Sequence, residues 1–297
     1  MSATTDAVLA ALALRLDTDA PAAFARAMCH EAEPWELGLA ISLGGADGAL
    51  LSYNPRTRGT GARSRMLSAL VRHGIDPEPA RQAFALVPDA RASTVLGMEW
   101  RAPVAGSPPA APSATLYLEE VSRFFEPREA ARRMRAFARL AGVDLASEVG
   151  RPGPLYIWAL DLSPAGITAF KVYRLADGNQ AAGVRAATLA HTGGTLDPGA
   201  DRLLFGGEPA SAFIVQKRHT PDHPAPLKVY KCHPYQQPGV DLRAAKAEVW
   251  NAVQHHGSGL ADAALAVLPP TSVGLRFASG SGNATGGTAY WCLELHR

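Results

Sequence analysis

The sequence has few cysteines and no long apolar run. Its 297 residues include three cysteines, Cys29, Cys232 and Cys292, which lie far apart and form no Cys-x-x-Cys pair. This sparse, odd number argues against a disulfide framework and indicates reduced thiols, as in the cytoplasm. No apolar stretch approaches the roughly 20 residues that cross a bilayer. Residues 7–14 are apolar but lie between Asp6 and Arg15, which predicts an amphipathic helix and not a signal peptide. We therefore expect a soluble, cytoplasmic protein.

An excess of either charge is also missing. The 29 Lys and Arg residues nearly balance the 27 Asp and Glu residues, for a net charge of +2, and the basic residues form no run. This balance gives no electrostatic reason to expect a nucleic-acid or membrane partner, and we expect a monomer. His219 and His223 have the spacing of metal ligands, but the prolines around them are more typical of a surface loop.

Several catalytic motifs are absent as well. The sequence contains no Asp-Asp-x-x-Asp motif for magnesium-bridged diphosphates, no Gly-x-Ser-x-Gly nucleophile elbow and no Walker lysine. These absences argue against a magnesium-dependent isoprenyl diphosphate synthase, a serine hydrolase and a P-loop enzyme. We expect no cofactor, no metal site and no requirement for Mg²⁺.

The chain does contain a pattern of one or two helices followed by two strands, repeated five times. The predicted helices cover residues 23–29, 64–73, 80–86, 127–141, 180–191, 242–256 and 261–268. The predicted strands cover residues 36–43, 49–53, 93–100, 114–120, 155–162, 168–175, 212–218, 227–232, 272–278 and 288–295. Gly- and Asp-rich turns join most strand pairs, as in β-hairpins.

Ten strands linked as hairpins predict an α+β fold with an antiparallel sheet. Such a sheet rarely stays open, because closure removes both exposed edges. We therefore expect a ten-stranded antiparallel β-barrel of five α-β-β repeats, with the helices forming an outer ring. The pattern continues through the Pro- and Ala-rich loop at 103–113, so residues 1–297 form a single predicted domain. A second loop is predicted at 279–287, which is rich in glycine.

The second strand of every unit carries one tyrosine, at intervals that match the repeat length. These tyrosines are Tyr53, Tyr117, Tyr173, Tyr230 and Tyr290. In units three and four, Lys171 and Lys228 lie two residues before Tyr173 and Tyr230, so each lysine shares a strand face with its tyrosine. One such pair is more often ordinary sheet surface. Five tyrosines at matched positions instead predict a common site.

Lysine and tyrosine together suit the transfer of an allylic group. Ammonium groups can hold a prenyl diphosphate and stabilise its departure as an anion. Tyrosine faces can stabilise the developing allylic cation by about 0.5–2 kcal/mol per ring, and an enclosed site keeps water from capturing it.

The α-β-β repeat and the Lys-x-Tyr strands resemble the ABBA (PT-barrel) aromatic prenyltransferases. The resemblance covers the whole chain and implies a ten-stranded barrel that moves a prenyl group from a diphosphate to an aromatic small molecule in secondary metabolism. It implies that Lys171 and Lys228 bind the diphosphate and that the five tyrosines, Tyr53 included, form a cation shield. Arg101, Lys217 and Arg276 could supply further charge.

The first strand resembles the indole-type members of that family. Pro34-Trp35-Glu36 is similar to their Pro-Phe-Glu, in which the glutamate accepts a hydrogen bond from the indole N–H. The resemblance implies that Glu36 is the catalytic residue and that the acceptor is indole-like, tryptophan-like or phenolic. One departure concerns the positions two before the other tyrosines, where Leu51, Thr115 and Thr288 replace basic residues.

Because of this departure, other functions stay open. A barrel with fewer cations could bind a small hydrophobic anion without chemistry, as a carrier or sensor. It could also prenylate a peptide side chain or perform another reaction, because fold does not settle function.

Overall fold

The structure is a computed structural model that describes residues 3–28, 35–43, 48–55, 60–87, 93–102, 111–119, 125–145, 155–221, 226–233, 239–256 and 271–295. Its strands are β1 (Trp35–Leu43), β2 (Gly48–Pro55), β3 (Ser93–Arg101), β4 (Ser113–Glu119), β5 (Leu155–Ser163), β6 (Gly166–Asp177), β7 (Ala212–His219), β8 (Leu227–Cys232), β9 (Ser272–Phe277) and β10 (Ala284–Leu295). Its helices are α1 (Ala3–Leu16), α2 (Ala20–Met28), α3 (Thr60–Arg72), α4 (Glu78–Leu86), α6 (Pro127–Leu140), the 3-10 helix η2 (Gly178–Gln180), α7 (Ala181–His191), α8 (Pro198–Phe205) and α9 (Leu242–His256).

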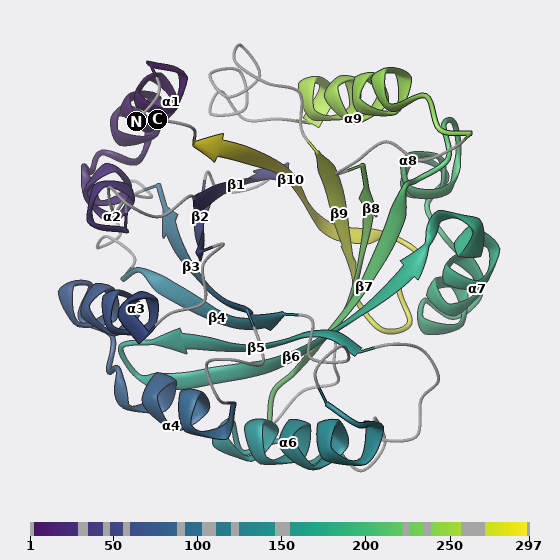
Figure 1. Ribbon diagram of the computed structural model, residues 1–297. Helices are drawn as coiled ribbons and strands as arrows, with labels where there is room; N and C mark the ends of the chain where they lie inside the picture. The colour runs from purple at the N-terminus through teal and green to yellow at the C-terminus, as the bar shows by residue number, and fades with distance from the viewer. Residues whose placement is uncertain are drawn as a thin grey trace.

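All strand pairs are antiparallel, and each strand pairs with the next one along the chain. The last strand, β10, pairs with β1 over nine residue pairs from Trp35–Leu295 to Leu43–Gly287, so the order of strands returns to its start as a barrel. The helices lie around the outside of this sheet (Figure 1). The prediction of an antiparallel sheet inside a ring of helices is confirmed.

Helix α6 shows why the helices cover the sheet. Pro127 occupies its first turn, where the missing proline N–H costs nothing. Its apolar residues recur at helical spacing and are buried along one side. From that side, the Phe137 ring contacts Trp158 of β5 and Phe170 of β6, at centroid distances of 6.2 and 6.1 Å. Trp158 and Phe170 therefore mark the outer face of the sheet.

Three segments differ from the prediction or fall outside the description. Helix α8 was missed; it is short, and the Asp197 carboxylate caps it by accepting a hydrogen bond from the Ala200 N–H at 3.0 Å. Strand β10 starts at Ala284, so the second half of the predicted loop at 279–287 is strand, with Gly286 and Gly287 paired to Arg276 and Leu275 of β9. The predicted helix at 261–268 lies outside the described residues.

Within the described segments, no helix combines the length and the apolar character that crossing a bilayer requires.

Candidate functional site

Four tyrosines meet on the inner face of the barrel. The centroid of the Tyr173 ring lies 6.0 Å from that of Tyr117 and 6.4 Å from that of Tyr230, and the Tyr230 and Tyr290 centroids lie 5.5 Å apart. These rings stand on β4, β6, β8 and β10, and each of these strands is separated from the next by one strand. Neighbouring rings therefore meet over an intervening strand, on the side opposite the helices. We call Tyr117, Tyr173, Tyr230 and Tyr290 the tyrosine row.

Two glycines make room for this row. Gly274 of β9 is directly opposite Tyr230, and a Cβ there would lie 2.6 Å from Cδ1 of that ring and 2.9 Å from Cε of Lys228. On the other side of the barrel, a Cβ at Gly97 would lie 3.2 Å from Cε2 of Tyr117. Any larger residue at Gly274 would displace the Tyr230 ring, because both contacts are shorter than real side chains tolerate.

Three members of the tyrosine row are neutral at ordinary pH. Burial, followed by the neighbouring phenol groups, raises the pKa of Tyr117, Tyr173 and Tyr230. Tyr290 differs, because its hydroxyl lies beside Lys228. Burial raises the pKa of Tyr290, but the Lys228 charge and its hydrogen bond outweigh burial, so the net shift is downward. Tyr290 is therefore the member of the row that is most able to carry negative charge.

Lys228 projects from β8 between two members of the row. Its Nζ donates to Oγ1 of Thr288 at 2.8 Å and to the Tyr290 hydroxyl at 3.0 Å. The same Nζ lies 4.9 Å from the Tyr230 ring centroid and 5.3 Å from that of Tyr290. Both hydrogen-bond partners are hydroxyl groups, and no carboxylate among the described residues forms an ion pair with Lys228. Lys228 can therefore bind an anion that enters the barrel.

Lys228 belongs to a line of cations across four consecutive strands. In the strand register, Lys171 of β6 is directly opposite Arg218 of β7, and Lys228 of β8 is directly opposite Arg276 of β9. Gln216 of β7 is directly opposite Lys228, so Arg218 is a diagonal neighbour of Lys228, at about 7–8 Å between backbones. We call Lys171, Arg218, Lys228 and Arg276 the cationic row. Arg218 and Lys228, the two middle members of the cationic row, lie close enough to bind one diphosphate group.

Arg218 was not among the site residues predicted from the sequence. It lies in the first strand of its unit, where no tyrosine marks the face, and only the register shows that it shares a face with Lys228. Arg218 therefore adds a cation to the inner face, where Thr115 and Thr288 replace basic residues of the family pattern.

The Asp161 carboxylate forms ion pairs with the two cations at one end of the cationic row, Lys171 and Arg218. The Lys171 Nζ lies 2.5 Å from Oδ1 of Asp161, and the Arg218 Nε lies 3.1 Å from Oδ2. The Thr115 hydroxyl donates to Oδ1 at 2.7 Å. Burial raises the pKa of Asp161, but Lys171, Thr115 and Arg218 outweigh it and hold the pKa below its usual range. Asp161 is therefore ionised. It was not predicted from the sequence, because no motif surrounds it.

The three other basic residues that were predicted to supply charge, Arg276, Arg101 and Lys217, differ in position. Arg276 is exposed and opposite Lys228, as expected for a residue at the end of the cationic row. Arg101 ends β3, and its exposed Nε lies 3.2 Å from Oε1 of Glu99, so a carboxylate already accompanies it. Lys217 is directly opposite Val172 and Leu227, on the outer face of the sheet, and does not join the row.

The assignment of Tyr53 to the cation shield is wrong. Tyr53 is opposite Leu96 of β3, whereas Tyr117 is opposite Val95, so the two tyrosines point to opposite faces. The Tyr53 ring is 1% exposed and lies in the core between the sheet and the helices. Its hydroxyl accepts a hydrogen bond from Nη2 of Arg65 on α3 at 3.0 Å. Tyr53 therefore attaches a helix to the outside of the barrel.

This position leads to a test. Tyr53→Phe should lower the free energy of unfolding by about 1 kcal/mol, because the bond to Arg65 is lost, and should leave any catalytic constant unchanged. Thermal unfolding and kinetics of the variant measure the two effects. Tyr117→Phe is the matched control inside the barrel. A catalytic loss in Tyr53→Phe equal to that in Tyr117→Phe would restore Tyr53 to the site.

The role of Glu36 stays a prediction. Its backbone lies in β1, paired with Asn54 of β2 and Glu294 of β10, but its side chain lies outside the described part of the structure. It is four residues from Ala40, which is directly opposite Tyr290. His223 also lies outside the description, so the predicted loop there is untested.

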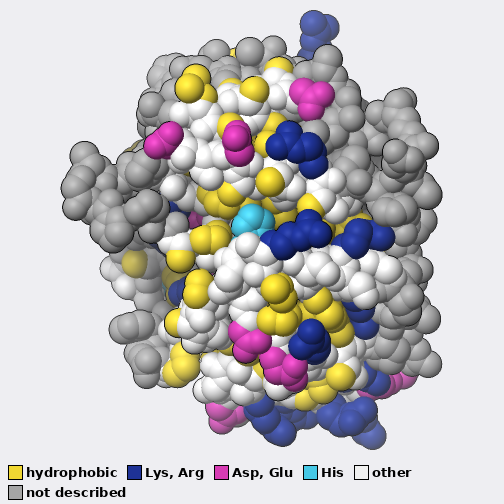
Figure 2. Space-filling view, turned by 90° about the vertical axis from the view of Figure 1, so that its left-hand side faces the viewer, with side chains coloured by type: hydrophobic (Ala, Val, Ile, Leu, Met, Phe, Trp, Pro, Cys, Tyr) yellow, Lys and Arg dark blue, Asp and Glu magenta, His cyan; other side chains and the backbone are white. Residues whose placement is uncertain are grey.

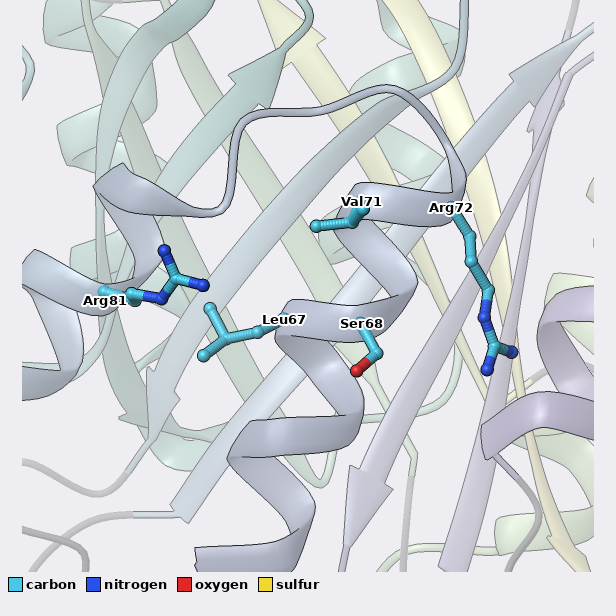
Figure 3. Close-up of a pocket in the computed structure, with 5 residues that line it drawn as sticks. All are labelled: Leu67, Ser68, Val71, Arg72 and Arg81. Atoms are coloured by element: carbon cyan, nitrogen blue, oxygen red, sulfur yellow. The ribbon is translucent and has the colours of Figure 1, made fainter.

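A depression on the outer surface is a weaker candidate. It has a volume of about 340 Å³ between α3 and α4 and is lined by Leu67, Ser68, Val71, Arg72 and Arg81 (Figure 3). Arg81 already approaches Glu78, at 3.4 Å. The neighbouring surface, on the left in Figure 1, mixes apolar, basic and acidic side chains (Figure 2). In the described ranges, no three His, Cys, Asp or Glu side chains form a group that could hold a metal ion. The inner face therefore offers the stronger chemistry.

The fold is similar to that of solved prenyltransferases. No protein-family profile matches the chain, and no curated protein matches it. Its structure is similar to 6-dimethylallyltryptophan synthase from Micromonospora olivasterospora in complex with DMASPP and Trp, with a TM-score of 0.65 at 16% identity, over 97% of this chain and 95% of that one. It is also similar to 5-dimethylallyltryptophan synthase from Streptomyces coelicolor, with a TM-score of 0.65 at 18% identity and the same two coverages.

A third similar structure is the prenyltransferase PriB in its apo form, with a TM-score of 0.55 at 16% identity, over 86% of this chain and 79% of that one. These identities are low, so the likeness concerns the fold. The resemblance inferred from the sequence is confirmed at that level: the protein has the fold of the ABBA-type aromatic prenyltransferases.

Proposed function

We propose that the protein transfers an allylic prenyl group from a prenyl diphosphate to an electron-rich aromatic small molecule, with an indole-like or tryptophan-like acceptor preferred over a phenolic one. The observation that carries this proposal is Lys228, an ammonium group whose hydrogen-bond partners in the described part of the chain are two hydroxyl groups, beside four tyrosines inside the barrel. The fold shared with dimethylallyltryptophan synthases supports it.

The diphosphate would lie along the middle of the cationic row. Lys228 and Arg218 carry N–H groups suited to phosphate oxygens, and Arg276 adds charge at the exposed end. When the bond between the prenyl carbon and the diphosphate oxygen breaks, the bonding electrons leave with the diphosphate. These cations stabilise that developing negative charge, which is the main way in which fixed charges accelerate such a step.

The allylic cation would form against the tyrosine row. Neutral phenol rings present negative faces to a cation, and together they displace water from its surroundings. The arene then attacks the cation through a ring carbon, and the resulting arenium ion loses a proton to restore aromaticity. Glu36 is our proposed acceptor for that proton and for the indole N–H hydrogen bond.

We further propose that the active form is the closed ten-stranded barrel and that it works without Mg²⁺. The pairing of β1 with β10 supports closure of the barrel. Closure also suits the chemistry, because an opening between these strands would let water reach the cation. The cationic row supports metal independence, since it supplies the positive charge that a metal ion would otherwise bring.

The direct test uses the full-length protein with dimethylallyl or geranyl diphosphate, a panel of indoles and phenols, and EDTA. Mass spectrometry should detect an acceptor enlarged by one prenyl group, with tryptophan or a simple indole as the best substrate. Glu36→Gln should lower kcat by about 10²–10⁴-fold with little change in donor KM, as expected for the loss of a general base. Asp6→Asn is the matched control, because it neutralises a carboxylate on α1.

A second function has one observation in its favour. Asp161 already neutralises part of the cationic row, which would suit a barrel that binds a small anion without chemistry. Such a binding protein would be stabilised against heat by prenyl diphosphates and would form no product with any acceptor in the panel. Product formation would exclude this alternative.

A further inference from the structure

Asp161 is a partly buried carboxylate among the cations of the proposed donor site. Its side chain is 14% exposed, and both of its oxygens are occupied, Oδ1 by Lys171 and Thr115 and Oδ2 by Arg218. These three partners stand on β6, β4 and β7. One carboxylate thereby connects four strands of the inner face and holds two cations in place.

The charge along the cationic row is therefore uneven. The Lys171–Arg218 end carries two positive charges and one negative charge, whereas the partners of Lys228 among the described residues are the hydroxyl groups of Thr288 and Tyr290. Asp161 accepts a hydrogen bond from Arg218 Nε, and the two terminal nitrogens of the guanidinium stay available as far as the described residues are concerned. An incoming diphosphate meets a full positive charge at Lys228 and a partly neutralised one next to Asp161.

We propose that Asp161 is a positioning residue of the donor site, one that holds Lys171 and Arg218 in place and competes with the diphosphate for both. This inference rests on the proposed function for the identity of the anion. Asp161 would keep the diphosphate centred on Lys228 and away from Lys171, and it would limit how tightly the barrel retains pyrophosphate after the transfer. Tight binding of donor and product alike does not accelerate the reaction.

The test is the affinity of the full-length protein for inorganic pyrophosphate, measured by isothermal titration calorimetry. Asp161→Asn should bind pyrophosphate about tenfold more tightly than the wild type, because a nearby like charge is removed. The gain should shrink in high salt. Asp201→Asn is the matched control: it also removes one negative charge, from an exposed pair with Arg185 on the outer helices, and should leave the affinity unchanged.

Two further variants guard against a folding artefact. Asp161→Ser, a smaller neutral residue, should also tighten pyrophosphate binding if Asp161→Asn proves unstable. Asp161→Glu, which keeps the charge, should show no gain. Unchanged or weaker binding in a folded neutral variant would overturn the inference, and so would an equal gain in Asp201→Asn.

Kinetics separate this role from a merely structural one. Asp161→Asn should lower the donor KM and also lower kcat, since pyrophosphate leaves more slowly. A structural defect would instead raise KM or lower the unfolding temperature with no gain in affinity. If the wild type transfers no prenyl group while Asp161→Asn still binds pyrophosphate more tightly, the proposed function fails and the inference about Asp161 stands.

Discussion

Lys228→Met is expected to lower kcat/KM for the prenyl diphosphate by roughly 10²–10³-fold, a loss typical of removing one preorganised charge from a developing anion. Methionine keeps the length and most of the volume of the lysine side chain, so the Tyr230 and Tyr290 rings retain their packing. The loss arises because no carboxylate of the described residues forms an ion pair with the Lys228 ammonium, whose hydroxyl partners leave its charge available to the donor.

Lys171→Met is the matched comparison, because Lys171 stands on the same inner face in the same Lys-x-Tyr pattern. Its loss should be about tenfold, since Asp161 already takes part of its charge. Steady-state kinetics at saturating acceptor measure both variants, and circular dichroism verifies their folding. Equal losses in the two variants, or a larger loss in Lys171→Met, would contradict the uneven distribution of charge along the cationic row.

Tyr230→Leu is expected to lower kcat by up to about 30-fold, because the ring that faces both Tyr173 and Tyr290 no longer stabilises the allylic cation. Water should also capture more of the cation. The ratio of prenyl alcohol to prenylated acceptor, measured by chromatography with mass detection, should therefore rise above that of the wild type.

Tyr230→Phe is the matched control, since it keeps the ring and loses only the hydroxyl that donates to Oε1 of Gln216. Its kcat should fall by no more than about fivefold, the effect of one hydrogen bond. A similar fall in Tyr230→Phe and Tyr230→Leu would show that the hydroxyl matters and the aromatic face does not.

Much of the site could be predicted from local spacing. A separation of two residues places Lys228 and Tyr230 on one face of β8, and likewise Lys171 and Tyr173 on β6, whatever the neighbouring strands do. The repeat length then relates the units to one another. The structure confirms that both lysines and four of the five tyrosines share the inner face.

What could not be predicted depends on register. Spacing shows which residues of a strand share a face but not which face it is, so Tyr53 was assigned inward although β2 turns it toward α3. Arg218 and Asp161 lie on first strands without a marker residue. Asp161 meets Thr115 and Arg218 across 46 and 57 residues of sequence, and only the paired strands bring them together.

The glycines near the end of the chain illustrate a second limit. Gly286 and Gly287 indicate a flexible loop by composition, yet both pair with β9 within the barrel wall. Closure of the sheet, which is a property of all the strands together, overrides the local preference of these two residues.

The central claim is that a prenyl diphosphate binds on the inner face with its phosphates on Lys228. A crystal structure of the protein with an inert analogue of dimethylallyl diphosphate tests it most directly. We predict density for the diphosphate within hydrogen-bonding distance of the Lys228 Nζ and for the prenyl tail against Tyr230 and Tyr290. Density for the analogue only on the outer surface, such as between α3 and α4, would contradict the account.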